Sequence, residues 1–196
     1  MNKILILFAH PLLEKSRIQT ALVKSIPASV NITFHDLYEE YPDFNIRIEK
    51  EKKLLHEHDI IILQHPFYWY STPPLLKQWI DLVLEFGWAY GPGGDALRDK
   101  IIFNVVSSGG TEEAYSSQGR NRFTVRQFLA PIEQTALLCH MIYLAPFVVH
   151  GTHLLTPEAI LGHALRYRAL LDQLQGTPKD SLKNFEGKYL NELVIK

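Results

Sequence analysis

Residues 64–95 read QHPFYWYSTPPLLKQWIDLVLEFGWAYGPGGD and follow directly on the apolar run Ile60–Leu63. The apolar run predicts a buried strand, and the consecutive aromatic residues 67–70 predict a turn where the chain leaves the sheet. The Thr-Pro-Pro run at residues 72–74 predicts the capped start of an amphipathic helix. A second aromatic loop, residues 87–91, follows that helix. Aromatic side chains beside a strand end favour a platform for a flat ligand.

The rest of the chain alternates between two kinds of segment. Short, nearly continuous apolar runs predict strands buried on both faces, at Ile4–Ala9, Ile60–Leu63, Ile101–Val106 and Ile142–Val149. Asn31–His35 alternates between polar and apolar residues and predicts an edge strand. Segments with helical periodicity lie between the strands, at residues 16–26, 46–58, 73–86, 122–139 and 157–174. This order predicts an α/β fold with a five-stranded parallel sheet and helices on both faces.

Length and composition indicate one globular domain. The 196 residues fit a single domain over residues 1–196, with a core over about residues 3–175 and a polar tail at 176–196. We expect the tail to cover a neighbouring surface or a partner subunit. Hydrophobic residues make up 46% and charged residues 21%, as in globular proteins. The net charge of −1, with no basic stretch, argues against a nucleic-acid partner.

The sequence also indicates a cytoplasmic location. The single cysteine, Cys139, cannot form an intrachain disulfide and is expected to be buried. The apolar N-terminus is short, lacks a cleavage site of small residues, and predicts a strand rather than a signal peptide. No window approaches the ~20 apolar residues of a transmembrane helix.

In an open parallel sheet, ligands bind beyond the carboxyl ends of the strands, where the strand order reverses. This rule selects three loops, at His10–Ser16, His65–Thr72 and Ser107–Tyr115.

The first of these loops predicts a phosphate site. Backbone N–H groups at the start of a helix suit an anion, and the expected helix opens with Ser16, Arg17, Ile18 and Gln19. The Ser16 hydroxyl and the His10 ring add further donors. The loop has neither a GxGxxG pattern nor a Walker sequence. A plain helix cap beside a solvated histidine explains this loop equally well.

The other two loops predict a site for a flat heteroaromatic ring. Four aromatics in a row between prolines do not have the spacing of a helical core stripe, so we interpret them as ligand-facing. The residues of this loop expected at the site are Pro66, Phe67, Tyr68, Trp69 and Tyr70. In the last loop, Ser108, Gly109, Gly110 and Thr111 are expected there, because glycine allows backbone to approach a ligand closely.

Other chemistries are less well supported. Ser108 lacks the GxSxG context of a hydrolase nucleophile. The histidine pairs His56/His58 and His150/His153 have no metal-ligand spacing, so no metal site is expected.

Together these motifs resemble the flavodoxin-like NAD(P)H:quinone oxidoreductase family, and especially the ancillary proteins of glutathione-gated potassium-efflux (Kef) antiporters. The resemblance runs from about residue 3 to about residue 170. The matching segments are Ala9-His10-Pro11 with Ser16, residues 41–46 (YPDFNI), residues 64–66 (QHP), 69–71 (WYS), 73–77 (PPLLK), 79–81 (WID), 87–91 (GWAYG), 93–94 (GG) and 109–110 (GG).

The resemblance implies a flavodoxin-like three-layer sandwich with strand order 2-1-3-4-5. It implies a non-covalent FMN rather than FAD, with the phosphate at His10 and Ser16–Gln19, and the isoalloxazine at Phe67–Tyr70 and Ser108–Thr111. It further implies hydride transfer from NAD(P)H to the flavin and then to a quinone-like acceptor, in a homodimer whose active site lies at the subunit boundary.

One position departs from the animal quinone reductases, in which a tyrosine and a histidine after the last loop assist hydride transfer. Tyr115 matches the tyrosine, but Asn121 stands where the histidine would be. Tyr115 is therefore the catalytic candidate without its usual partner.

Three functional hypotheses follow. The first is an FMN-dependent quinone reductase. The second is a regulatory binding subunit, peripheral at the inner face of the membrane, that docks on a Kef-type potassium antiporter; the resemblance includes both roles. The third, a flavodoxin-type electron carrier, fits poorly because such carriers are usually strongly acidic, and this chain has a net charge of −1.

Overall fold

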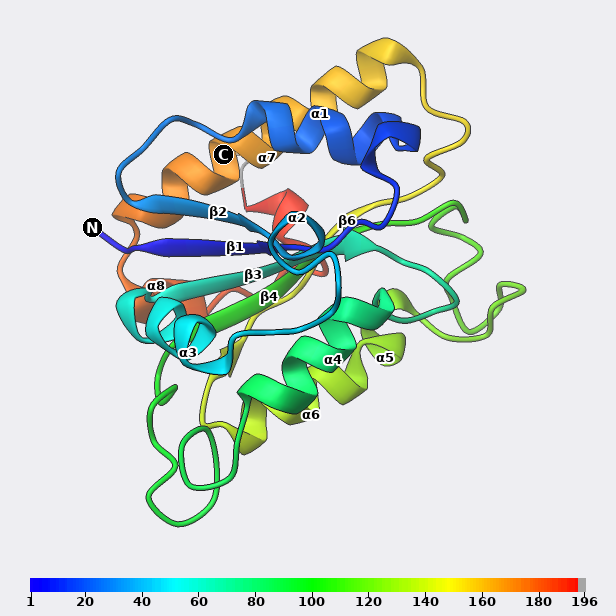
Figure 1. Ribbon diagram of the computed structural model, residues 1–196. Coiled ribbons are helices and arrows are strands. Elements are labelled where there is room, and N and C mark those ends of the chain that lie inside the picture. The colour runs from blue at the N-terminus through cyan, green and yellow to red at the C-terminus, as the bar shows by residue number, and fades with distance from the viewer. Residues whose placement is uncertain (194–196) are drawn as a thin grey trace.

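A computed structural model describes residues 1–193 of the protein. Strands and helices alternate along the chain, and Figure 1 shows the sheet between two layers of helices. The strands are β1 (Ile4–Phe8), β2 (Ile32–Asp36), β3 (Ile60–Pro66), β4 (Ile101–Ser107), β5 (Ile142–Tyr143) and β6 (Phe147–Val149). The helices are α1 (Arg17–Ser25), α2 (Leu37–Glu40), α3 (Ile48–Glu57), α4 (Pro74–Val83), α5 (Val125–Phe128), α6 (Ala130–Leu138), α7 (Pro157–Gly176) and α8 (Lys179–Lys183). Two short 3-10 turns are η1 (Leu13–Lys15) and η2 (Leu190–Glu192).

The sheet is parallel throughout, in the order β2-β1-β3-β4-β5, which confirms the predicted order. The outermost place in the sheet, beside β4, differs from the single strand predicted over residues 142–149. It consists of two short strands, β5 and β6, which pair with the two ends of β4. Pro146 lies between them, and proline has no N–H to donate to a ladder.

The sequence of β1 shows why helices cover both faces of the sheet. Successive side chains of a strand point to opposite faces. Ile4 and Ile6 pack into a cluster with α1 and α7, whereas Leu5 and Leu7 pack into a cluster with α3 and α4. The strand must therefore be apolar at every position, as the nearly continuous apolar runs predicted.

Several predicted helices differ in their bounds for local reasons. The helix predicted over residues 122–139 is divided into α5 and α6, because Pro131 cannot continue a helix and stands in the first turn of α6. Arg122 lies outside α5, in a left-handed conformation with φ of 63°. The predicted cap of α4 at Thr72 is wrong: Pro73 is the N-cap, without a side-chain hydrogen bond. The predicted cap at Ser16 is confirmed, and Thr156 caps α7 in the same way.

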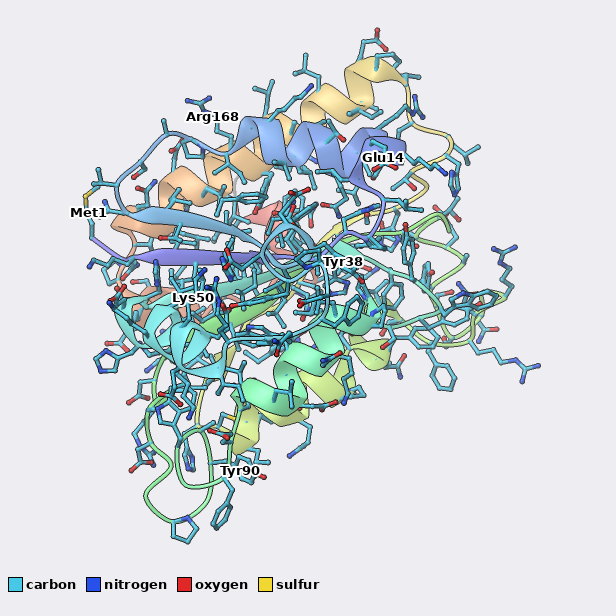
Figure 2. The ribbon with its side chains drawn as sticks, in the orientation of Figure 1. Met1, Glu14, Tyr38, Lys50, Tyr90 and Arg168 are labelled. Atoms are coloured by element: carbon cyan, nitrogen blue, oxygen red, sulfur yellow. The ribbon has the colours of Figure 1, made fainter. Side chains whose placement is uncertain are left out.

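The second aromatic loop, residues 87–91, does not extend the predicted platform. It belongs to the connection from α4 to the amino end of β4, whereas the aromatic turn follows the carboxyl end of β3. Figure 2 shows Tyr90 of this loop far from Glu14, which belongs to η1 beside the first candidate loop. Trp88 and Tyr90 pack instead against the hydrophobic core. The aromatic residues of this loop therefore stabilise the fold and do not line the cavity at the carboxyl ends of the strands.

The segment after α7 folds onto the chain's own sheet. Leu182 and Leu190 are buried in the cluster that also holds α1 and α7. The amide of Asn191 pairs with the backbone of Val148 in β6, accepting from its N–H (2.9 Å) and donating to its carbonyl (3.0 Å). This segment therefore covers the outer edge of β6. Within residues 1–193, no helix is long and apolar enough to cross a membrane.

Candidate active site

A cavity of about 840 Å³ opens at the carboxyl ends of the strands. It is lined by residues of the three predicted loops and of a fourth, which follows β6. The lining residues are His10, Lys15, Ser16, Arg17, Ile18, Pro66, Phe67, Tyr68, Trp69, Tyr70, Ser107, Gly109, Tyr115, Arg120, Asn121, Thr152 and His153. The carboxyl-end rule thus located the cavity, and the four loops bring polar, aromatic and cationic groups together.

The first loop presents the start of α1 to the cavity. Ser16 is the N-cap, and its Oγ accepts the N–H of Gln19 at 3.2 Å. The N–H groups of Arg17 and Ile18, in the first turn, have no intrahelical carbonyl to bond, so they remain available to an anion. This geometry is consistent with a plain helix cap and with a phosphate site, because a capped helix start can also bind a phosphate.

His10 lies beside this helix start and is only 5% exposed. Its Nδ1 accepts the N–H of Leu12 at 3.1 Å, which leaves Nε2 as the protonated donor of the neutral ring. Burial lowers the pKa of His10, and the nearby Glu14 carboxylate offsets this only in part. A neutral His10 can therefore donate a hydrogen bond at neutral pH. Of the two alternatives for this loop, the one with a solvated histidine is therefore wrong.

The lysine and arginine side chains of the lining make the cavity positively charged. Lys15, Arg17 and Arg120 contribute cations, and none of the lining residues is Asp or Glu. The Arg17 guanidinium donates to the carbonyl oxygens of Leu155 (3.1 Å) and Thr152 (3.5 Å). Arg17 thereby fixes the fourth loop against α1, and the cavity as a whole favours anionic ligands.

The aromatic turn is a tight reversal held in an unusual backbone conformation. The N–H of Ser71 donates to the carbonyl of Tyr68 at 2.9 Å, and both residues between them have positive φ, 48° at Trp69 and 65° at Tyr70. Two positive φ values at the centre are typical of a type I′ turn, which normally takes Gly or Asn there. Each such non-glycine residue costs on the order of 1 kcal/mol or more. The strain is compatible with a functional requirement for aromatic side chains at this place.

The side chains of this turn lie in different environments. Trp69 is 93% exposed, whereas Phe67 is buried. Tyr70 stacks on Phe128 with ring centroids 4.9 Å apart, and Tyr68 meets the edge of His10 at 5.9 Å. The turn therefore presents one free indole and two supported phenol rings to the cavity.

The loop after β4 does not contribute every residue predicted there. Gly109 lines the cavity, but Ser108, Gly110 and Thr111 do not. Ser108 is 1% exposed; its Oγ donates to the hydroxyl of Tyr115 (3.0 Å) and accepts the N–H of Gly110 (3.2 Å). Neither partner of Ser108 is a histidine, which agrees with the small weight given to a hydrolase. Ser108 instead holds Tyr115, the catalytic candidate, against the cavity wall.

Close packing explains the two glycines of this loop. A Cβ at Gly109 would lie 2.8 Å from Nε2 of His153, and a Cβ at Gly110 would lie 2.8 Å from the Tyr115 ring. Any larger residue would push one of these rings away. The glycines therefore set the positions of Tyr115 and His153 rather than only leaving space for a ligand.

Gln19 was predicted as a phosphate contact, but its side chain lies below the cavity and is 0% exposed. Its amide nitrogen donates to Ser107 Oγ (2.9 Å) and to the carbonyl of His65 (3.3 Å). Its amide oxygen accepts from Gln64 (2.9 Å), which in turn accepts from the hydroxyl of Tyr167 (2.8 Å). Gln19 therefore supports the cavity floor and joins α1, β3, β4 and α7.

A second buried network fixes Pro66, which lines the cavity. The Nδ1–H of His65 donates to the Pro66 carbonyl at 2.9 Å, because that oxygen can only accept. Nε2 then accepts from Asn104 (3.0 Å), whose oxygen accepts from the Tyr143 hydroxyl (2.7 Å). Complete burial lowers the pKa of His65 to about 4, although the bond to Pro66 opposes the shift. His65 is thus a neutral structural element of the cavity floor.

The sequence interpretation missed Lys15, Ser107, Arg120, Thr152 and His153, and named Asn121 only as a missing histidine. Asn121 accepts a long hydrogen bond from the Tyr70 hydroxyl (3.4 Å) and so connects two loops. Thr152 and His153 follow the carboxyl end of β6. The same strand-end rule selects them once the fifth strand is included. Among residues 1–193, no group of three or more potential metal ligands occurs.

Comparisons with known proteins agree with this geometry. A family described as having a flavodoxin-like fold matches residues 2–171. The glutathione-regulated potassium-efflux system ancillary protein KefG of Pectobacterium atrosepticum is 44% identical over 165 residues, which cover 84% of this chain and 90% of that protein.

Two solved structures are also similar. General stress protein 14 of Treponema denticola, in complex with FMN, is 38% identical with a TM-score of 0.82, and covers 88% of this chain and 99% of its own. An NADPH-quinone reductase from P. pentosaceus is 34% identical with a TM-score of 0.76, and covers 85% of this chain and 95% of its own. Because the family match spans residues 2–171 and these relatives cover 84–88% of the chain, the chain belongs to the family of flavodoxin-like proteins.

Proposed function

We propose that this protein is an FMN-dependent NAD(P)H:quinone oxidoreductase that works by two-electron, ping-pong hydride transfer. One observation carries the proposal: a single cavity combines a helix start with free backbone N–H groups and an aromatic turn beyond the same strand ends. The FMN complex of the Treponema denticola relative and the quinone reductase from P. pentosaceus support the same assignment.

The residues present fit FMN. The N–H groups of Arg17 and Ile18, the hydroxyl of Ser16 and the Nε2–H of His10 would hold the phosphate. The aromatic turn at residues 66–70 and the backbone of Gly109 would hold the isoalloxazine. The cavity volume of about 840 Å³ lies within the range of small-molecule sites. Gln19 contributes by supporting the floor.

When bound, FMN supplies the ability to accept a hydride from NAD(P)H and pass it to a quinone. The protein supplies position and hydrogen bonds. The Tyr115 hydroxyl accepts from Ser108, so its own hydrogen is free to be donated into the cavity. We assign Tyr115 the role of a hydrogen-bond donor to the reacting substrate, and Asn121 that of joining Tyr70 to the wall that carries Tyr115.

The second candidate function is a regulatory one, favoured by the similarity to KefG. The protein would dock as an ancillary subunit on a Kef-type potassium antiporter at the inner face of the membrane. As part of the same proposal, we infer a homodimer in which the active site lies at the subunit boundary. Co-purification with a Kef-type antiporter tests the docking, and light scattering tests the dimer.

The absorption spectrum of the purified protein tests the first function. We expect the bands of oxidised flavin, bleached by NADPH and restored by a simple quinone. FMN should bind more tightly than riboflavin, which lacks the phosphate. Ser16→Ala should reduce this preference for FMN by roughly tenfold, the loss expected for a hydrogen bond to a charged group. If no flavin co-purifies and added FMN does not bind, the enzyme assignment is wrong and the regulatory function becomes the favoured one.

Thr156→Ala is the matched control for Ser16→Ala. Thr156 caps α7 with the same 3.2 Å bond to a backbone N–H, here that of Ala159, but does not line the cavity. Both variants should lose similar cap stability, about 1 kcal/mol. Only Ser16→Ala should change FMN binding, and equal effects in both variants would contradict a phosphate at α1.

A further inference from the structure

One cation of the cavity is not explained by the flavin phosphate. Of the three lining cations, Arg17 is engaged with the carbonyls of Thr152 and Leu155, and Lys15 lies next to the helix start. Arg120 lies on a different loop, the one after β4. Figure 1 shows η1 and the start of α1 on one side of the strand ends, and the connection from β4 to α5 projecting beyond them on another. A single phosphate at α1 therefore leaves Arg120 without an anion.

The guanidinium of Arg120 has no ion pair and no hydrogen bond within the part of the chain that the structure describes. Some other arginines are paired, such as Arg126 with Glu133 at 2.8 Å and Arg98 with Asp95 at 2.5 Å, whereas Arg122 and Arg166 have no ion pair within residues 1–193 either. Glu112, on the same loop, forms an ion pair with Lys188 at 2.5 Å. Arg120 is thus an uncommitted cation in the wall of a cavity without lining carboxylates.

The backbone around Arg120 is firmly placed. The N–H of Asn121 donates to the carbonyl of Ala114 (3.1 Å), and the N–H of Arg122 donates to the carbonyl of Gly119 (3.0 Å). A Cβ at Gly119 would lie only 2.2 Å from the carbonyl oxygen of Glu113, so the loop doubles back closely on itself. These contacts hold Arg120 in the wall, beside Asn121 and its hydrogen bond from Tyr70.

We propose that Arg120 is a specificity-determining residue that binds the pyrophosphate of the nicotinamide dinucleotide donor. This inference rests on the proposed function. In a ping-pong reaction, donor and acceptor use the cavity in turn, but only the donor must carry a pyrophosphate, while a simple quinone is uncharged. A guanidinium binds phosphate oxygens bidentately, so it strengthens donor binding and leaves a neutral acceptor unaffected.

The test measures the two half-reactions separately by stopped flow on FMN-loaded protein. Arg120→Gln should lower the second-order rate constant for flavin reduction by NADPH by roughly tenfold to a hundredfold, the loss of a charge-assisted hydrogen bond. Reoxidation by a neutral quinone should be unchanged, which also shows that the variant is folded. Arg120→Lys should recover part of the loss, and the salt dependence of reduction should weaken in Arg120→Gln.

A binding measurement gives a readout without turnover. ADP-ribose contains the pyrophosphate but no nicotinamide, and its binding can be followed by tryptophan fluorescence, because Trp69 lines the cavity. Arg120→Gln should weaken ADP-ribose binding by a similar factor. Arg122→Gln is the control, since Arg122 is an exposed neighbour that does not line the cavity.

The outcomes separate the two proposals. If the protein binds no flavin, or if NADPH does not bleach it, the proposed function fails and the role of Arg120 fails with it. If the flavin is reduced normally but Arg120→Gln behaves as the wild type, or slows both half-reactions equally, only the role of Arg120 is overturned.

Discussion

Glu51 shows how this fold accommodates a fully buried carboxylate. It is 0% exposed on α3, yet three side chains point donors at it. The His35 Nε2 lies 3.0 and 3.1 Å from its two oxygens, the Trp79 indole donates at 2.8 Å, and the Tyr41 hydroxyl also donates. Burial alone would raise the pKa of Glu51, but the hydrogen bonds from His35, Tyr41 and Trp79 outweigh it and hold the pKa below its usual value. Trp79 therefore packs in the hydrophobic core and also has a polar role.

Glu51→Gln should lower the free energy of unfolding by about 2–4 kcal/mol near neutral pH, because the new amide group leaves buried donors unpaired. A carboxylate with a lowered folded pKa stabilises the protein above its ordinary pKa, and that contribution is lost as the pH falls through the folded value. The difference in the free energy of unfolding between the wild type and Glu51→Gln should therefore become smaller in acid. Urea titrations at several pH values measure it, with Glu49→Gln as control, since Glu49 is 86% exposed on the same helix. A gap that stays constant below pH ~4 would contradict the assignment.

His65 predicts a pH dependence of a different origin. The unfolded chain binds a proton at His65 below the ordinary pKa of 6.5, whereas the folded protein does so only below about 4. Between these values the unfolded state holds more protons, so stability falls as the pH falls. The shift corresponds to about 3 kcal/mol. His65→Gln should reduce the decline in stability between pH ~6.5 and ~4 by about that amount. His56→Gln, at an exposed position on α3, should retain the wild-type decline, and identical slopes in all three proteins would exclude His65 as its source.

At the scale of single elements, the aromatic turn combines strain with exposure. Trp69 has a φ of 48° and is 93% exposed, so neither backbone preference nor burial explains a tryptophan there. Trp69→Gly and Trp69→Ala both remove the indole, but only glycine adopts positive φ without steric cost. We expect Trp69→Gly to be about 1 kcal/mol more stable than Trp69→Ala, as measured by urea unfolding. Both should weaken FMN binding to the same extent. Equal stability of the two variants would show that the turn is not strained.

The elements also show how far sequence reasoning reaches in this chain. Runs that are apolar at every position identified the strands, because both faces of a parallel sheet are covered. The interruptions were harder to predict, since Pro131 and Pro146 break a helix and a strand that periodicity alone describes as continuous. The loop after β6 was likewise considered only as the histidine pair His150/His153, because the strand-end rule was applied to the earlier strands alone. Its position after a strand end nevertheless places it at the cavity.

The parts of the candidate site that directly follow a strand end could be predicted from the sequence. The side chains whose positions depend on residues far away in the sequence could not. The strand-end rule needs only the order of elements, so it located the cavity and the aromatic turn. The orientation of Gln19 depends on Ser107, 88 residues away in the sequence, and a local pattern contains no such information. Arg120 was missed because a charged loop residue usually indicates only a solvated surface, and its place in the wall depends on how the loop doubles back.

At the scale of the whole molecule, the question is whether the segment after α7 belongs to the cooperative fold. The sequence of this segment is polar and weakly periodic, yet Leu190 is 0% exposed and its N–H donates to the carbonyl of Pro146 at 3.0 Å. Together with the amide of Asn191 on Val148, this contact covers the outer edge of β6, which would otherwise be an unpaired sheet edge. The covered strand leads directly into the fourth loop of the cavity.

Leu190→Ala should therefore destabilise the entire domain by about 2–4 kcal/mol, as for a leucine in a core, and not only loosen the chain end. Leu137→Ala is the matched control, because Leu137 is 54% exposed on α6 and should cost less than about 0.5 kcal/mol. Urea unfolding followed by far-UV circular dichroism and by tryptophan fluorescence measures both variants. The three tryptophans lie outside the segment after α7, so a fluorescence midpoint that shifts with Leu190→Ala reports on the rest of the domain. A fluorescence midpoint that moves no more than in Leu137→Ala would mean that the segment is an independent cover and that the sheet is stable without it.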